Sequence, residues 1–207
     1  MKKLTIIIIF LFVGTISAQT KYQNGMRKAL SLWEKGELNK ASQLFERISK
    51  AEPEKWLPPF YAAKVEILGS FGLKEEIKLK NKLTKAQELL DLAKSNSKNN
   101  PEILITQALL NTGYIAFDGQ KYGMILSGKT TQLYTKALEL SPENPRVILG
   151  NAEWNIGSAR FFGKTTTPYC KEIERAIKLG KEESIEKEFY PKFKAQRAKQ
   201  VLNQCRK

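Results

Sequence analysis

Residues Gly36 to Pro53, GELNKASQLFERISKAEP, decide the fold of this chain. Apolar side chains recur in this stretch at spacings of three or four residues: Leu38, Ala41, Phe45 and Ile48. That spacing puts them on one face of an α-helix of 3.6 residues per turn. Gly36 breaks the chain before the helix, and Pro53 ends it. The small Ala41 lets a neighbouring helix approach, and the large Phe45 fills the space beside it.

This pattern resembles the second helix of a tetratricopeptide (TPR) repeat, in which Gly, a large apolar residue, Ala, an aromatic residue, Ala and Pro follow one another. The preceding stretch, 22–35, carries Ala29 and Leu32 at helical spacing and resembles the first helix. Ile48 stands where the family usually has Ala. The resemblance implies an all-α, right-handed solenoid of about four helix pairs with a C-terminal capping helix.

Turn residues and apolar spacing divide the chain further into four repeats and a cap. The expected repeats span 22–55, 56–100, 101–144 and 145–180, and the cap helix spans 182–205. The boundary prolines Pro53, Pro101 and Pro142 lie 48 and 41 residues apart, whereas a plain repeat has about 34 residues. The excess predicts insertions. One of them, 117–129, carries several glycines and is interpreted as a loop or as an insertion folded back on the repeats.

Segment 1–18 has the three-part layout of a secretory signal peptide. Two lysines precede an almost wholly apolar run over 4–13, and Ile-Ser-Ala at 16–18 forms a plausible cleavage site. The alternative is a membrane anchor, but the run is too short for the roughly 20 residues that a spanning helix needs. We therefore expect one exported domain, 19–207, located in the periplasm or outside the cell, with no membrane span after cleavage.

The charge of the chain is strongly positive, with 35 basic and 21 acidic residues and a formal net charge of +14. Lys and Arg are scattered along the expected helices and interleaved with Glu, as in KEESIEKE at 181–188. This pattern is typical of solvated helix faces and does not form the basic stripe of a nucleic-acid-binding surface. A weak attraction to anionic surface polymers remains an alternative.

The sequence contains no histidine, and this limits the kinds of catalytic and metal site that the chain can form. It removes Ser-His-Asp and Cys-His catalysis and the usual zinc sites, and two cysteines cannot form a four-thiolate metal site. No glycine-rich phosphate loop is present. We expect no cofactor, no metal and no enzymatic activity. The alternative is a carboxylate-dependent cell-wall glycan enzyme, for which the only Glu-Ser pair is Glu183-Ser184, within a charged helical pattern.

Cys170 lies at the start of one expected helix and Cys205 at the end of the last one. Two consecutive antiparallel helices bring such ends together, and an oxidising compartment then permits a disulfide. The alternative is two unpaired thiols, with Cys170 packed as a small apolar residue.

In TPR proteins the first helix of each repeat lines a concave groove, and this resemblance implies the groove residues here. They are Met26, Leu30, Trp33, Phe60, Lys64, Ile67, Thr112, Arg146 and Glu153. The family's clamp for a peptide carboxylate is missing, because Met26 and Leu30 replace its Lys and Asn. An apolar groove with a few charges suits an amphipathic helix or an extended peptide. Core packing is the alternative role for Trp33 and Phe60.

The sequence thus predicts a non-enzymatic adaptor or scaffold of the bacterial cell envelope that binds a protein or a peptide of unknown identity. Two alternatives stay open: the glycan enzyme and the binder of anionic polymer. A pair of carboxylates converging in one cleft favours the enzyme, and a continuous apolar groove favours the adaptor.

Overall fold

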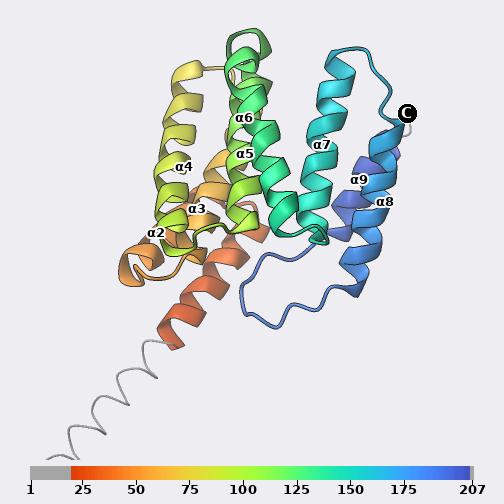
Figure 1. Ribbon diagram of the computed structural model, residues 1–207. Coiled ribbons are helices and arrows are strands. Elements are labelled where there is room, and N and C mark those ends of the chain that lie inside the picture. The colour runs from red at the N-terminus through yellow and green to blue at the C-terminus, as the bar shows by residue number, and fades with distance from the viewer. Residues whose placement is uncertain (1–19, 206–207) are drawn as a thin grey trace, which may run out of the picture.

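The computed structural model describes residues 20–205, and within them the chain forms nine helices and no strand (Figure 1). The N-terminal helix is described over 20–34. The others are α2 (Leu38–Ala51), α3 (Leu57–Leu68), α4 (Glu76–Asn96), α5 (Pro101–Phe117), α6 (Gly119–Leu140), α7 (Pro145–Phe161), α8 (Thr167–Glu182) and α9 (Ala195–Cys205). The expected signal peptide, 1–18, lies outside the described residues. No helix in 20–205 combines the length and apolarity that crossing a membrane requires.

The helices pack in sequential antiparallel pairs, which confirms the predicted all-α architecture of stacked helix pairs (Figure 1). The most extensive packing joins α5 to α6, α3 to α4 and α7 to α8. Buried side chains form two clusters, one spanning the N-terminal helix to α5 and the other spanning α7 to α9. Each pair therefore covers an apolar face of the next.

α2 forms as its apolar spacing predicts, with Ala41 and Phe45 fully buried. Gly36 adopts φ +78° before it, a left-handed conformation that favours glycine. Ile48, the large residue at a position where the TPR pattern has Ala, is accommodated by Gly25 on the N-terminal helix. A Cβ on Gly25 would lie 3.2 Å from Cδ1 of Ile48. One small residue thus compensates for one large residue across the helix pair.

Two Asn-Pro signals start helices where the sequence predicts. Oδ1 of Asn100 accepts a hydrogen bond from the N–H of Glu102 at 2.9 Å, and Asn144 does the same for Arg146 at 2.9 Å. A proline follows each cap in the first turn, where no backbone donor is needed.

The stretch 117–129 is not a loop, and that interpretation is wrong. α6 is a single helix of 22 residues from Gly119 to Leu140, capped by the Asp118 side chain, which accepts from the N–H of Lys121 at 2.9 Å. Each interior glycine costs about 1 kcal/mol of helix propensity. Packing of α6 along α5 offsets this cost and includes ring contact between Tyr114 and Tyr122 at 5.0 Å.

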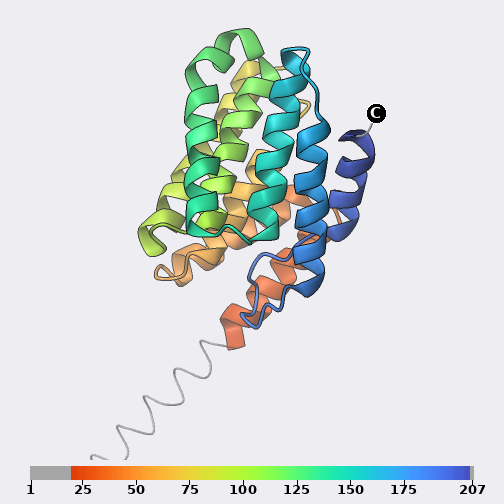
Figure 2. The same ribbon diagram turned by 45° about the vertical axis from the view of Figure 1, so that its right-hand side comes forward.

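The C-terminal region also differs from expectation. The cap helix begins at Ala195 rather than at residue 182, because residues 183–194 are not helical. We call 183–194 the strap. It crosses beside the N-terminal helix and returns to α9 (Figure 2). The ring of Phe193 occupies the space where a Cβ on Gly180 of α8 would stand, so this glycine allows the strap to pack closely on the helix.

A buried carboxylate links α2, α3 and α4. Glu66 of α3 is 5% exposed. It accepts hydrogen bonds from Ser42 Oγ at 2.6 Å and from Lys82 Nζ at 2.8 Å. Burial raises the pKa of the Glu66 carboxyl, but the hydrogen bonds from Lys82 and Ser42 and the charge of Lys85 outweigh it, so the pKa is lowered.

Candidate functional site

The apolar residues predicted to line a groove lie mostly in the core. Met26, Phe60 and Ile67 are fully buried. Leu30 and Trp33 are half-buried and pack against the same cluster, where the Trp33 ring contacts Tyr61 at 5.9 Å between centroids. In this conformation none of the three fully buried side chains is accessible to a partner.

Arg146, a charged groove residue, sits in a half-buried ionic network. Its Nε lies 2.8 Å from Oε1 of Glu102, and its NH1 lies 2.6 Å from Oε2 of Glu183 in the strap. Glu102 is fully buried, and its Oε1 also accepts from Asn144 at 2.8 Å. Its Oε2 is the only buried side-chain polar atom in residues 20–205 without a hydrogen-bond partner. The network joins α5, α7 and the strap.

Lys64 and Glu153 are the other charged residues predicted to line the groove. Lys64 has no ion pair within the described part of the chain, and its Nζ is 5.5 Å from the centroid of the Phe60 ring. Burial lowers the pKa of the Lys64 ammonium; Glu102 opposes this shift, and the cations Arg146 and Arg197 add to it. Burial also raises the pKa of Glu153, although Arg197 holds its carboxylate at 2.6 Å.

Thr112 is turned toward its own helix, since its Oγ1 donates to the carbonyl oxygen of Ala108 at 2.9 Å. The structure therefore brings Lys64 and Arg146 close to the Glu102 carboxylate, whereas Glu153 pairs with Arg197 and Thr112 bonds within its own helix. The carboxylates of Glu153 and Glu183 are each held by an arginine. Within residues 20–205, no group of three or more His, Cys, Asp or Glu side chains is placed to hold a metal ion.

A different surface stands out at one end of the helices, where the loops α3–α4, α5–α6 and α7–α8 lie together (top of Figure 1). Large exposed apolar side chains belong to these loops or to the helix turns beside them: Leu68, Phe71, Ile77, Met124, Ile125, Phe161 and Phe162. Met124 is 95% exposed and Phe161 is 75% exposed. We call these seven residues the apolar end. Clustered exposure of this kind marks binding surfaces.

A pocket of about 270 Å³ opens within the apolar end. Its lining comes from the α3–α4 loop, α4 and the last turns of α5: Ser70, Phe71, Gly72, Leu73, Lys74, Leu79, Gly113, Ala116 and Phe117. Gly72 has φ +83°, which lets the loop turn sharply, and Gly113 lets Ser70 approach α5. A wider depression of about 400 Å³ beside Gly36 contains Lys40 and Lys82, but both are paired with carboxylates.

Charged groups beside the apolar end favour an anionic ligand. Glu76, at the start of α4, accepts hydrogen bonds from Lys121 and from the Tyr122 hydroxyl at 2.7 Å. These bonds, together with one from Lys80, lower the pKa of the Glu76 carboxyl to about 2. Its charge is thus compensated by two lysines, and Lys74 adds a further cation to the pocket wall.

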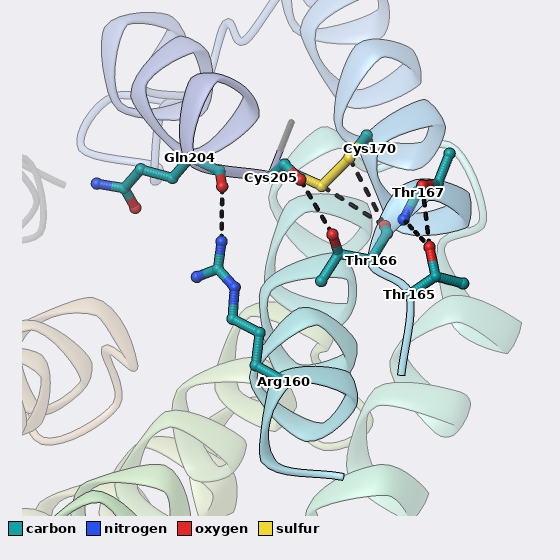
Figure 3. Close-up of a disulfide and its surroundings, with 7 residues drawn as sticks. All are labelled: Arg160, Thr165, Thr166, Thr167, Cys170, Gln204 and Cys205. Carbon is teal, nitrogen blue, oxygen red and sulfur yellow. Dashed lines mark hydrogen bonds between the residues drawn. A yellow bond between two sulfur atoms is a disulfide. The ribbon is translucent and has the colours of Figure 1, made fainter. Parts of the chain in front are cut away.

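The two cysteines form a disulfide between α8 and the end of α9 (Figure 3). The carbonyl oxygen of Thr166 lies 3.6 Å from both sulfur atoms; these are contacts, because disulfide sulfurs carry no proton. Arg160 NH2 donates to the carbonyl oxygen of Gln204 at 2.6 Å, which fixes the same turn of α9 to α7.

Comparison with known proteins gives a likeness of fold. No family model and no curated protein matches the chain. Among solved structures, it is similar to the HusA haemophore from Porphyromonas gingivalis. The TM-score is 0.77 and the sequence identity 21%, and the match covers 88% of this chain and 91% of that one. At this identity the likeness establishes a shared all-α fold.

Sequence reasoning missed the apolar end. The available signals were the Phe161-Phe162-Gly163 turn and the apolar residues among the glycines of 117–129. Both were assigned to helix ends and insertions, because periodicity does not tell which apolar residues remain uncovered.

Proposed function

We propose that this protein is an exported, non-enzymatic carrier that binds haem or a related porphyrin at the apolar end. The observation that carries the proposal is the presence of seven large exposed apolar side chains at one end of the bundle, beside a pocket whose lining includes Lys74. The haemophore likeness supports this class of cargo. The Cys170–Cys205 disulfide supports an oxidising, extracytoplasmic compartment, as the signal peptide predicts.

The surface chemistry suits a porphyrin, which has flat apolar faces and carboxylates on one edge. Phe71, Met124 and Phe161 offer apolar and aromatic contact area to a ring face. Removing about 200 Å² of apolar surface from water contributes about 5 kcal/mol before the costs of binding. Lys74, which lines the pocket, offers a partner for a carboxylate. The pocket itself holds only part of such a ligand, so the rest lies against the exposed side chains.

The donor set argues for recognition of the ring rather than of the iron. Haem iron is commonly held by His, Cys, Met or Tyr. This chain has no His, both cysteines are bonded to each other, and Met26 is buried. Met124 and Tyr122 are the donors nearest the apolar end, and the Tyr122 hydroxyl already donates to Glu76. We therefore expect metal-free protoporphyrin to bind about as tightly as haem.

An absorbance titration of the mature protein with haem and with metal-free protoporphyrin tests the proposal. Phe71→Ala and Met124→Ala remove side chains at the apolar end, and each should weaken binding roughly tenfold. Leu92→Ala on α4 and Leu140→Ala on α6 are matched controls, because both side chains are exposed at the other end of the bundle. Failure of both porphyrins to bind, or equal weakening by the controls, would overturn the proposal.

The predicted binding of a protein or peptide remains a second proposal. It is supported by the strap, a segment of this chain that lies along helices expected to form the groove. The TPR relationship likewise remains a proposal that rests on the first repeat and on the boundary prolines.

A further inference from the structure

The strap is a non-helical segment with a turn over 187–190, and its aromatic residues rest on other aromatic rings. Phe189 packs edge-on against Tyr22 with centroids 5.8 Å apart, and Tyr190 packs edge-on against Trp56 at 5.8 Å. The hydroxyl of Tyr61 donates to the carbonyl oxygen of Phe189 at 2.7 Å. The receiving rings come from the N-terminal helix, from α3 and from the turn just before it.

The acidic residues of the strap meet basic residues of the helices. Glu183 pairs with Arg146 of α7 at 2.6 Å. Glu188 pairs with Arg27 of the N-terminal helix at 2.7 Å and accepts from Gln23 at 2.9 Å. The guanidinium of Arg146 also lies 5.7 Å from the centroid of the Tyr190 ring. We call the surface under the strap, formed by Tyr22, Arg27, Trp56, Tyr61 and Arg146, the bed. The strap and the bed are therefore complementary in charge as well as in apolar surface.

The bed is built from helices that the sequence predicts to line a peptide groove. The N-terminal helix, α3 and α7 are the first helices of three repeats, and Arg146 is itself one of the predicted groove residues. A non-helical segment of this chain thus lies along helices that were expected to line the groove, and it pairs with one of the predicted groove residues, Arg146. Its sequence over 183–190, ESIEKEFY, combines acidic residues with an aromatic pair, and this surface binds both.

Several features show that the strap is held less firmly than the helices. Phe189 and Tyr190 are only half-buried, and the Arg27–Glu188 pair is largely exposed. The disulfide anchors α9 at Cys205, beyond the strap, so that helix stays attached when the strap moves.

We propose that the surface formed by Tyr22, Trp56, Tyr61, Arg27 and Arg146 is a binding site for an acidic–aromatic segment of a partner protein, and that the strap is its resident occupant. A partner with the same pattern of Glu followed by Phe-Tyr displaces the strap. This surface lies at the opposite end of the bundle from the apolar end (Figure 1), so the two sites are separate.

The covalent link between the strap and the rest of the chain limits how well a separate peptide can compete for the bed. A strap joined to its bed by the chain has an effective concentration on the order of millimolar, so a free peptide of the same sequence competes poorly with it. Weakening the strap in the chain removes this competition. The free peptide should then bind more tightly to the weakened protein than to the wild type.

The test uses the full mature chain with the double substitution Phe189→Ala and Tyr190→Ala, and a fluorescent peptide of residues 181–192, KEESIEKEFYPK. Fluorescence anisotropy should give a Kd at least about tenfold lower for this variant than for the wild type. Phe161→Ala is the matched control, since it removes an exposed ring far from the strap. Adding Arg27→Gln to the double variant should weaken the peptide, and less so when the peptide carries Gln at the position of Glu188.

The proposal is overturned if the double variant keeps its helical circular dichroism and its thermal transition but does not bind the peptide at about 1 mM. Binding that ignores both the Phe-Tyr pair and the Arg27 charge overturns it as well. Hydrogen exchange on the wild-type chain gives a measurement without any substitution. Strap amides should open more readily than those of α3, and protection equal to that of global unfolding would make the strap a fixed part of the fold.

Discussion

Removing the disulfide is the perturbation whose effect the structure predicts most directly. The bridge joins Cys170 to Cys205, 35 residues apart. Closing a loop of that length restricts the unfolded chain and, in the chain-entropy model, stabilises the native state by about 3.8 kcal/mol at 25 °C. A domain of this size loses about 2–4 °C of Tm per kcal/mol. Reduction should therefore lower Tm by about 8–15 °C.

The native contacts around the bridge indicate that the fold itself survives reduction. α9 keeps its packing on α8 through the fully buried Ala198, and Arg160 still holds the carbonyl oxygen of Gln204. The loss thus comes chiefly from the freed unfolded chain rather than from a damaged native state. The reduced protein should keep its helical content at 25 °C.

Urea unfolding followed by circular dichroism measures the effect on oxidised protein, on reduced protein and on the Cys170→Ala, Cys205→Ala variant. Both sulfurs are buried, so reduction needs mild denaturant followed by refolding in reductant. The reduced protein and the variant should agree within about 1 kcal/mol, because they share the same open chain. A difference of less than about 1 kcal/mol between oxidised and reduced protein would refute the loop-closure reasoning.

Two further perturbations test the packing and the buried charge. Gly180→Ala should destabilise the protein by about 1–3 kcal/mol, because the new Cβ meets the Phe193 ring. Gly157→Ala, in open space on α7, should stabilise it by about 0.5–1 kcal/mol. Thermal unfolding measures both changes, and a change of the same sign in the two variants would contradict the predicted clash at Gly180. Glu66→Gln should cost about 1–3 kcal/mol at pH 7. Because the pKa of Glu66 is lowered in the folded protein, its ionised form stabilises the fold at neutral pH, and this stability is lost below about pH 4.5. The difference in unfolding free energy between wild type and Glu66→Gln, measured by urea unfolding, should therefore be smaller at pH 3 than at pH 7. An equal difference at both pH values would argue against the ionic contribution.

Much of the helical pattern was readable because its causes are local. The Asn-Pro pairs at 100–101 and 144–145 start α5 and α7 through bonds to residues two positions away. The spacing of Ala41 and Phe45 likewise predicts the buried face of α2. The same local reasoning failed at 117–129, because glycine lowers intrinsic helix propensity while packing along α5 supplies the compensation.

The predicted groove residues show that apolar spacing alone does not predict which residues line a groove. An apolar residue on a first helix can face the neighbouring helices or the concave side, and periodicity does not separate the two. Met26, Phe60 and Ile67 face the core, whereas Arg146 lies near the surface under the strap. Whether a residue is charged therefore predicts its burial better than its position along the helix does, because burying an unpaired charge is costly.

By itself the sequence determined the starts of α5 and α7, the apolar face of α2 and the stacking of antiparallel pairs, since each depends on residues within one or two helical turns. Only the tertiary structure decided the strap, the apolar end and the burial of the charged network. Gln23 bonds to Glu188 across 165 residues and Tyr61 bonds to the strap across 128, and such contacts depend on how all the intervening helices stack. The segment 183–188 is rich in good helix formers, yet it is not helical, because the adjoining aromatic pair packs on helices from the other end of the chain.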